Sequence, residues 1–536
     1  MKSGLIRIEL RYWVLLALLA AASALVFPGR TYLQSDTQIY IPLFEHLKDP
    51  SLLQRELILE GAHLSYTIYD EVTLALNRWT GLDFEWVLLA QQCLFRFVGT
   101  VGAFLLARAC GLSSWASWVV SGVVWMGAFV YGPAIITTEY EPVPRGYAVG
   151  LAVFALGARA AGWSAWLAGA ALGVAVLYHA PAVWPILLVA ALVRDWKMLG
   201  PVAVSAGLLF MSGKMQVGVV QAQPFFSVIS EEHRKIQMMR APYNWLELWL
   251  PRYFWTFVLT GGLALLAERR LRGTLPLLVR PYLRWLPWIG VATIPLSYLL
   301  LERMGWALFP QMQPMRAMLY CHLLCQWLGA IVAMQEMRER RWVQGALWLL
   351  LPLSLAFRGD LLLFTEAKVW GQVVLTLALF GVCWLATQSY AQRLAPALLL
   401  VPYLFAWKGD GAPAKLETPD LSATAQWARA QTDKDAMFFF PDLGRKPEPG
   451  IFRARAARAV YACWKQGGQV NYFEGYAKKW HERWTTLLAK GHAAMDYANL
   501  RERGIDYLVL TKDQPKENLP EVFRAPGGAY RVYQLR

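Results

Sequence analysis

The chain has 536 residues, of which 57% are hydrophobic and only 17% are charged, and its mean hydropathy is +0.33. Soluble domains carry about 25% charged residues, so this composition excludes an ordinary soluble protein and indicates a polytopic membrane protein. The net charge of +15 does not indicate nucleic-acid binding, because the basic residues cluster in short loops between apolar stretches, where they set membrane orientation.

The N-terminus carries basic residues ahead of an apolar run, as a signal peptide does, but no convincing cleavage site with small residues follows. We therefore interpret it as a retained first helix. Several of the apolar stretches are shorter than the about 20 residues that a full span needs, so we expect about 11–13 transmembrane helices. The stretches lie at 12–28, 86–107, 115–137, 146–160, 163–179, 182–193, 199–213, 246–267, 285–302, 317–336, 342–357, 369–387 and 395–407.

Basic residues mark alternate loops, and by the positive-inside rule these loops face the cytoplasm. The intervening outer segments are 29–85, 138–145, 214–245, 303–316 and 358–368, and an odd number of spans leaves the tail outside as well. The basic loop residues are Lys2, Arg7, Arg11, Arg108, Arg159, Arg194, Lys197, the run from Arg269 to Arg284, Arg338, Arg340, Arg341 and Arg393.

The first outer segment, residues 29–85, is the first long polar interruption of the chain. Apolar residues recur at helical spacing over 39–60 and 64–79, which predicts two helices lying along the membrane surface. Such helices would cover a cavity at the membrane boundary. Together with the spans they form a predicted transmembrane domain of residues 1–408.

The tail, residues 409–536, is predicted to be a small extracytoplasmic α/β domain, long enough for a core of its own. Capping and periodicity predict helices over 421–431, with a cap at Ser422, and over 474–490. Strands are predicted over 436–440, 459–464 and 507–510, and a hairpin around Gly527 and Gly528.

Ionisable side chains gather where the predicted spans meet the outer segments. Such groups are costly near lipid unless they face a wet cavity or a partner, so each is a functional candidate. The candidates are Asp36 and Tyr40 in the first outer segment, Glu139, Glu141 and Arg145 in TTEYEPVPRGY, His179 in LYHAP, His233 and Arg240 in the third segment, and Gln313 and Arg316 in FPQMQPMRAM.

This arrangement resembles the GT-C superfamily, the polytopic glycosyltransferases that use polyprenyl-phosphate-linked sugars. The resemblance rests on Asp36 soon after the first span, the long first outer segment, the acidic and Arg-bearing second segment and the globular tail. It is closest to a bacterial branch whose tail has an Ala-Trp-Ala segment and an Arg-rich strand region, here at 426–429 and 452–465. Many members have paired acidic residues in the first loop, whereas Ser35 and Thr37 flank Asp36 here, which weakens any argument for a metal.

The resemblance implies an inverting glycosyltransferase in the bacterial inner membrane, working on the extracytoplasmic side with its N-terminus in the cytoplasm. Asp36 is then the general base that takes a proton from the acceptor hydroxyl. Arg145 and Arg316 suit the departing phosphate, because guanidinium offers bidentate donors. The donor is a polyprenyl-phosphate-linked sugar, and the acceptor is a glycan, a lipid or a protein.

Other candidates have supporting roles in this reading. His179, His233 and Arg240 are second choices for the phosphate. Glu139 or Glu141 would orient the acceptor or help to ligate a divalent cation, and the sequence leaves the need for a metal open.

Each candidate also has a plainer structural explanation. Asp36 can cap a surface helix, and Glu139 and Arg145 can form a solvated ion pair. His179 can be a buried histidine bonded to a carbonyl that Pro181 frees, and the basic cluster 231–240 can attract headgroups. The tail's basic residues are expected to form a solvated face: Arg453, Arg455, Arg458, Lys465, Lys478, Lys479 and His481.

A transporter or flippase of lipid-linked glycans is the competing functional class, and a scaffold of the same fold without chemistry is a third. A transporter would place ionisable residues at midspan and broken helices in related halves. Here the ionisable residues concentrate at the outer span ends, which favours the enzyme, with Arg96 in the second span as an exception. The sequence contains no Walker loop, HExxH or CxxC motif, which argues against an ATP-driven pump, a zincin or a redox protein.

Overall fold

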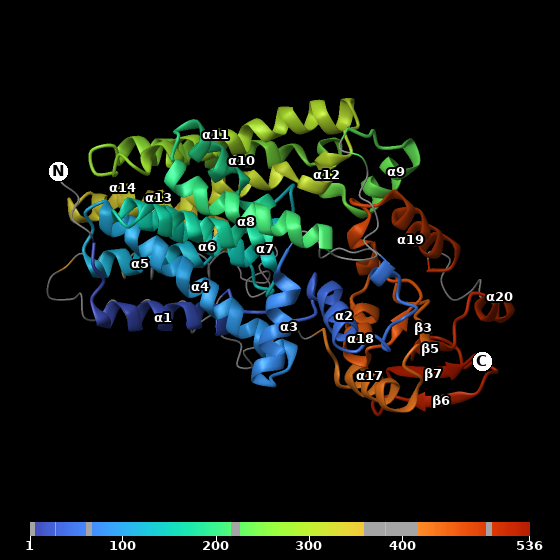
Figure 1. Cartoon of the computed structure of the whole chain (residues 1–536). Coiled ribbons are helices and arrows are strands. Elements are labelled where there is room, and N and C mark those ends of the chain that lie inside the picture. Colours follow the sequence, from blue (N-terminus) through green and yellow to red (C-terminus); the bar gives the residue numbers. More distant parts are fainter. Residues whose placement is uncertain are drawn as a thin grey trace.

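The structure is a computed structural model that describes residues 6–26, 28–60, 67–215, 226–357, 416–488 and 496–536, with the single residues 224, 381 and 388. A body of long helices carries a smaller domain of strands and helices at one end (Figure 1). The chain is an α-helical polytopic membrane protein with a small C-terminal α/β domain, as predicted.

The helical body contains α1 (Leu10–Leu25), α4 (Phe84–Ala109), α5 (Ser114–Trp125), α6 (Pro144–Ala160), α7 (Ala165–Leu192), α8 (Trp196–Met215), α10 (Pro251–Arg270), α11 (Arg280–Ser297), α13 (Leu319–Arg338) and α14 (Trp342–Phe357). Four helical segments of the described chain are long and apolar enough to cross a membrane: Phe84–Ala109, Ala165–Leu192, Arg280–Arg303 and Leu308–Arg338. The predicted spans at 369–387 and 395–407 lie outside the described residues.

Two predictions of spans were wrong. The stretches 163–179 and 182–193 both fall in α7, whose two helical parts meet at a kink at the non-helical residue His179, and together they make one candidate span. The stretch 115–137 is helical only as far as Trp125, and an antiparallel hairpin of β1 (Phe129–Val130) and β2 (Ile135–Ile136) follows. Hydropathy does not separate a buried hairpin from a span, because both bury apolar side chains.

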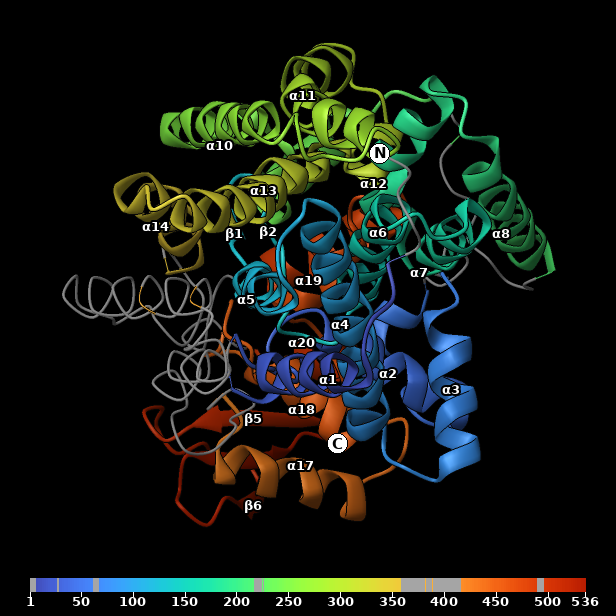
Figure 2. The same cartoon turned by 90° about the vertical axis from the view of Figure 1, so that its left-hand side faces the viewer.

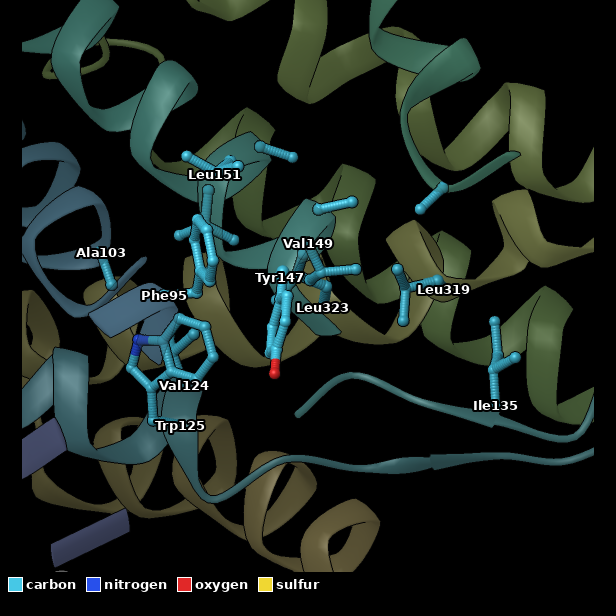
Figure 3. Packing of buried hydrophobic residues seen from close by; sticks show 14 of the residues in the cluster. Phe95, Ala103, Val124, Trp125, Ile135, Tyr147, Val149, Leu151, Leu319 and Leu323 are labelled. Atoms are coloured by element: carbon cyan, nitrogen blue, oxygen red, sulfur yellow. The ribbon is translucent and has the colours of Figure 1, made fainter. Parts of the chain in front are cut away.

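α4 and α6 pack closely at the centre of the body because glycines face the neighbouring backbone. A Cβ on Gly102 of α4 would collide with the backbone of α6, and one on Gly157 of α6 would collide with the Gly102 carbonyl. Small residues allow membrane helices this close an approach. Beside them the rings of Phe95 and Tyr147 stack with centroids 4.7 Å apart, and Trp125 lies next to Phe95 (Figure 3).

Figure 2 views the molecule from the end opposite the C-terminal domain. α4, α6 and α13 lie inside the body, and the apolar window of the α12–α13 segment is entirely buried. α8 lies at the periphery with apolar side chains such as Val204 and Phe210 exposed. In a membrane protein such a face contacts lipid.

Arg96 is buried inside the body and has a structural role. Its guanidinium donates hydrogen bonds to the backbone carbonyls of Ser23, Gly29 and Glu139, at 3.0 Å for Gly29 and 2.5 Å for Glu139. These carbonyls belong to the end of α1, the start of the first outer segment and the second outer segment. Arg96 therefore joins the two segments, and its position inside a span does not require a transport pathway.

The first outer segment forms α2 (Thr37–Lys48) and α3 (Tyr69–Thr80) within the two regions predicted as surface helices, although α2 ends well before residue 60. Later outer segments form α9 (Glu231–Arg240) and α12 (Leu308–Met312), for which no helix was predicted. Arg145 stands at the start of α6 and Arg159 at its far end.

The C-terminal domain has one five-stranded sheet in the order β4-β3-β5-β7-β6, in which β3 pairs in parallel with β4 and β5 while β7 is antiparallel to β5 and β6. The predicted hairpin is confirmed as β6–β7. The elements are α17 (Pro419–Gln431), β3 (Met437–Phe439), α18 (Glu448–Ala456), β4 (Ala459–Val460), η7 (Trp464–Gln469), α19 (Glu474–Thr486), α20 (Tyr497–Glu502), β5 (Tyr507–Thr511), β6 (Glu521–Arg524) and β7 (Tyr530–Gln534).

Two details of this domain differ from the predictions. Thr418, not Ser422, caps α17, and its hydroxyl accepts a hydrogen bond from the backbone N–H of Leu421 at 3.2 Å. Of the strand predicted over 459–464, the structure has only β4 at Ala459–Val460, and the 3-10 helix η7 begins at Trp464. The division of the chain at residue 408 stays a prediction, since it falls outside the described residues.

A fully buried ion pair fastens the C-terminal domain to the first outer segment. Arg453 of α18 contacts Glu56 at 3.1 Å, and both side chains are 0% exposed. Arg453 also donates a hydrogen bond to the Gln38 carbonyl of α2 at 2.8 Å. α2 and α18 accordingly lie side by side (Figure 1), and a Cβ on Gly450 of α18 would collide with the Gln38 side chain.

Candidate active site

One cavity of about 570 Å3 lies between the outer segments of the helical body and the C-terminal domain. Its lining comes from four outer segments, from the bend of α7 and from η7, so parts of the chain far apart in sequence meet there. Nine of the ten side chains predicted as site residues line it: Asp36, Tyr40, Glu139, Glu141, Arg145, His179, Arg240, Gln313 and Arg316.

Glu141 organises the start of α2, where Asp36 lies. Its carboxylate accepts hydrogen bonds from the backbone N–H groups of Ser35 and Asp36, both at 2.6 Å, and from the Thr37 hydroxyl at 2.8 Å. A carboxylate satisfies the free N–H groups of a helix start well. Asp36 occupies the N-cap position, but its side chain makes no capping hydrogen bond. The capping explanation therefore applies to Glu141, and the Asp36 carboxylate faces the cavity.

Asp36 forms an ion pair with a residue of the C-terminal domain. The Lys465 ammonium lies 3.2 Å from Oδ1 of Asp36 and donates a hydrogen bond to the Ser35 hydroxyl at 2.6 Å. Burial raises the pKa of Asp36, but the charges of Lys465, Arg145 and Arg316 outweigh burial and hold the pKa below its ordinary value. Asp36 is therefore ionised throughout the neutral range.

The pKa of Glu141 shifts in the opposite direction. Burial raises the pKa of Glu141 above its ordinary value, and the nearby negative charge of Asp36 raises it further. Two carboxylates in one cavity thus have different partners: Asp36 faces the cavity and is paired with Lys465, whereas Glu141 is engaged by backbone N–H groups.

Arg145 is held by Glu139. Nε of Arg145 lies 2.5 Å from Oε1 of Glu139, and both side chains are largely buried. Gly146 permits this contact, because a Cβ there would press against the Glu139 side chain. Glu139 and Arg145 therefore form the expected ion pair. The pair lines the cavity, however, and is not solvated.

The bend of α7 places His179 in the cavity. His179 has φ −162° and ψ 82° inside the helix, and Pro181 lacks the N–H that would donate to the Leu177 carbonyl. The first outer segment supplies the missing donors: the Ile68 N–H bonds to the Leu177 carbonyl at 3.0 Å, and the Thr67 hydroxyl to the Tyr178 carbonyl at 2.9 Å. The carbonyls that Pro181 frees are thus satisfied by the outer segment and not by His179.

Arg316 lines the cavity and contacts a histidine. Its Nη1 lies 3.3 Å from Nε2 of His179. Because guanidinium only donates, Nε2 of His179 is the acceptor in this contact. Among the residues that the structure describes, Arg316 has no carboxylate within ion-pair distance, so a ligand anion is a suitable counter-charge.

Arg240 and a set of tyrosines complete the lining. Nε of Arg240 donates a hydrogen bond to the Trp464 carbonyl at 2.9 Å, so the guanidinium also touches the C-terminal domain. Aromatic rings with hydroxyl groups offer apolar faces and polar edges together, as a sugar requires. The lining tyrosines are Tyr40, Tyr140, Tyr178, Tyr243 and Tyr472.

Two expectations about polar residues were wrong. His233 does not line the cavity: it is fully buried on α9, its Nε2 lies 2.6 Å from the Val470 carbonyl, and burial lowers its pKa. The tail's basic residues are not one solvated face, because Arg453 and Arg458 are buried and Lys465 enters the cavity. Tyr140 and Tyr178 were missed although they adjoin predicted residues, whereas Lys465 has no local signal.

The donor set does not fit a divalent cation. Asp36 is paired with Lys465, Glu139 with Arg145, and Glu141 accepts several hydrogen bonds. Nowhere in the described chain do three histidine, cysteine or acidic side chains converge as metal ligands would. We therefore derive no step through a metal.

Comparisons with known proteins give few clues to function. A family model described as a domain of unknown function (DUF6798) matches residues 419–487, which include Lys465. No curated protein matches the sequence.

Among solved structures, the chain is similar to the crystal structure of ArnT from Cupriavidus metallidurans bound to undecaprenyl phosphate, with 13% identity and a TM-score of 0.48 over 98% of this chain and 97% of that one. It is also similar to the archaeal oligosaccharyltransferase AglB from Archaeoglobus fulgidus in complex with an inhibitory peptide and a dolichol-phosphate, with 12% identity and a TM-score of 0.38 over 94% of this chain and 69% of that one. At such scores the likenesses carry no argument about function, so the site itself has to support one.

Proposed function

We propose that this protein is a membrane glycosyltransferase that moves a sugar from a polyprenyl-phosphate-linked donor to an acceptor hydroxyl, with Asp36 as the general base. The observation that supports this proposal is the shared cavity. An ionised carboxylate, Asp36, faces the same space as the Arg316 guanidinium, which lacks an acidic partner among the described residues. A base and an anion site in one aromatic cavity are the two requirements of sugar transfer from a phosphate.

The reaction is a single displacement at the anomeric carbon. Asp36 takes the proton from the acceptor hydroxyl as its oxygen bonds to that carbon. The bond from the carbon to the phosphate oxygen breaks at the same time, and polyprenyl phosphate leaves as an anion. Arg316, and Arg145 within its pair with Glu139, would stabilise the charge that develops on the phosphate. One displacement inverts the anomeric configuration.

A cavity at one end of the long helices suits a donor whose lipid lies among them. Arg145 and Arg316 stand at the starts of α6 and of the α13 segment, while Arg159 and Arg338 stand at their far ends. The donor lipid would lie among the apolar helices while its phosphate and sugar reach the cavity. By the positive-inside rule the cavity then faces outward, on the extracytoplasmic side of a bacterial inner membrane.

The test is transfer by the purified protein in proteoliposomes loaded with polyprenyl-phosphate-linked sugars. Free polyprenyl phosphate, measured by mass spectrometry, is released whichever sugar is moved. Asp36→Asn should lower the rate by about 100-fold or more, because a general base contributes at least that factor. Asp83→Asn is the matched control, since Asp83 is exposed and its side chain makes no capping hydrogen bond. Substantial activity in Asp36→Asn would remove Asp36 as the base.

A further inference from the structure

Lys465 comes from the C-terminal domain but reaches a cavity that is lined mostly by the helical body. It belongs to η7 of the C-terminal domain, yet its ammonium reaches across to Asp36 and Ser35 at the start of α2. Its side chain is 21% exposed and lines the cavity together with Arg316 and Arg145.

The backbone that carries Lys465 is fixed, while its side chain is long and flexible. The side chain of the neighbouring Gln466 bonds to the backbone that precedes it: its Oε1 accepts from the Cys463 N–H at 2.7 Å, and its Nε2 donates to the Val460 carbonyl at 2.6 Å. A lysine ammonium is a point charge on four rotatable carbons, so it can exchange one anionic partner for another without backbone movement.

The ion pair between Lys465 and Asp36 conflicts with the proposed role of Asp36 as the general base. A carboxylate oxygen that accepts a hydrogen bond from an ammonium at 3.2 Å is less available to an acceptor hydroxyl. The same ion pair keeps the pKa of Asp36 low, which makes the carboxylate a weak base. A base of this kind needs its counter-ion to leave when the substrate is in place.

We propose that Lys465 is a phosphate-binding residue that the C-terminal domain supplies to the cavity, and that it moves from Asp36 to the donor phosphate when the donor binds. This inference rests on the proposed function. One movement of the ammonium then places a third cation beside Arg316 and Arg145 and frees the Asp36 carboxylate for the acceptor. The C-terminal domain is accordingly part of the catalytic site and not only a platform for the acceptor.

The test is equilibrium binding of undecaprenyl phosphate, a polyprenyl monophosphate, to the full-length protein in nanodiscs. Lys465→Met should weaken binding by about tenfold or more, because a charge-assisted hydrogen bond is lost. Lys465→Arg, which keeps the charge, should bind within about threefold of the wild type. Lys512→Met, on an exposed residue of the same domain, should leave binding unchanged.

A second arm tests the exchange of partners. Asp36→Asn releases Lys465, so it should tighten phosphate binding, and this gain should be clearly smaller in the Asp36→Asn/Lys465→Met double variant. Equal binding by Lys465→Met and wild type, or equal losses in Lys465→Met and Lys465→Arg, would mean that the ion pair only joins the domains and would overturn the inference. Neither result would touch the role of Asp36, whereas a wild type that does not bind undecaprenyl phosphate would overturn the proposed function and this inference together.

Discussion

Three carboxylates lie in the cavity, and their partners decide which of them is available for chemistry. Glu139 is held by Arg145, and Glu141 caps α2 from a position 105 residues further along the chain. Asp36 is left facing the cavity. The motif around Asp36 could be placed at the membrane rim from the sequence, because it follows the first apolar run. The choice among the three could not, since it depends on hydrogen bonds between distant segments.

The low pKa of Asp36 leads to a prediction about pH. A carboxylate whose pKa is depressed in the folded protein keeps its charge, and the stability it contributes, until the pH falls below its ordinary range near about 4. The kcat/KM for the donor should therefore stay level between pH 7 and about pH 5, because this parameter reports the free enzyme, in which Lys465 pairs with Asp36. Initial rates across this interval, with tryptophan fluorescence to monitor folding, provide the measurement. A half-maximal loss of rate near pH 6 in folded protein would contradict an ionised Asp36 in the free enzyme.

Replacement of Arg316 and replacement of Arg145 should have different effects on transfer and stability. Arg316→Ala should lower kcat/KM for the donor by about tenfold or more and leave the acceptor KM unchanged, because it removes an anion-binding cation. Arg145→Ala should lower donor use as well, but it also leaves the buried Glu139 carboxylate without its partner, so the Tm should fall too. Donor and acceptor kinetics and thermal unfolding separate the two effects.

Arg303→Ala is the control for both variants, because Arg303 is exposed and contacts Tyr298 outside the cavity. Equal effects of Arg316→Ala on the two substrates would count against a phosphate role.

At the scale of elements, periodicity located the helices but not their interruptions. The surface helices of the first outer segment are present as α2 and α3, since their apolar positions recur at helical spacing. The bend of α7 was misread as a gap between two spans. Pro181 marks the kink in the sequence, and the carbonyls of Leu177 and Tyr178 beside the kink accept hydrogen bonds from Ile68 and Thr67. Such compensation comes from tertiary contact and leaves no local pattern.

The cap of α2 makes a prediction at this scale. In Glu141→Gln, an amide replaces the carboxylate. A carboxylate only accepts hydrogen bonds, whereas the NH2 group of the amide donates them and would face backbone N–H groups, which also donate. The start of α2 should loosen, and the transfer rate should fall by about tenfold or more through misplacement of Asp36. Hydrogen exchange of the amides at residues 35–40 should speed up, while exchange in the C-terminal sheet should not change. A slow transfer rate with unaltered exchange at 35–40 would instead indicate that Glu141 acts on the substrate directly.

At the scale of the whole molecule, the class of protein and the α/β character of the tail followed from composition and periodicity. The relation between the two parts did not. The basic residues of the tail were expected on a solvated face, because nothing local distinguishes Arg453 or Lys465 from exposed residues. The structure buries Arg453 against Glu56 and places Lys465 against Asp36, so the residues that bind the domain are also those that complete the cavity.

The buried pair between Arg453 and Glu56 should therefore control both stability and activity. Arg453→Met leaves the Glu56 carboxylate buried without a counter-charge, which costs about 3–5 kcal/mol, and the Tm should fall accordingly. Transfer should fall as well, because Arg453 also bonds to the Gln38 carbonyl of α2, the helix that begins beside Asp36. Arg524→Met, at an exposed pair on the same domain, should stay within about 0.5 kcal/mol of the wild type.

The Glu56→Gln/Arg453→Met double variant distinguishes an uncompensated charge from lost packing. If the cost comes from the lone carboxylate, the double variant should recover part of the Tm lost in Arg453→Met, since no charge then remains buried without a partner. A double variant less stable than Arg453→Met would show that packing and hydrogen bonds around Arg453 dominate. Recovery of Tm without recovery of transfer would separate the two functions of this contact: charge balance holds the domain in place, while the bond from Arg453 to α2 keeps Asp36 in register with Lys465.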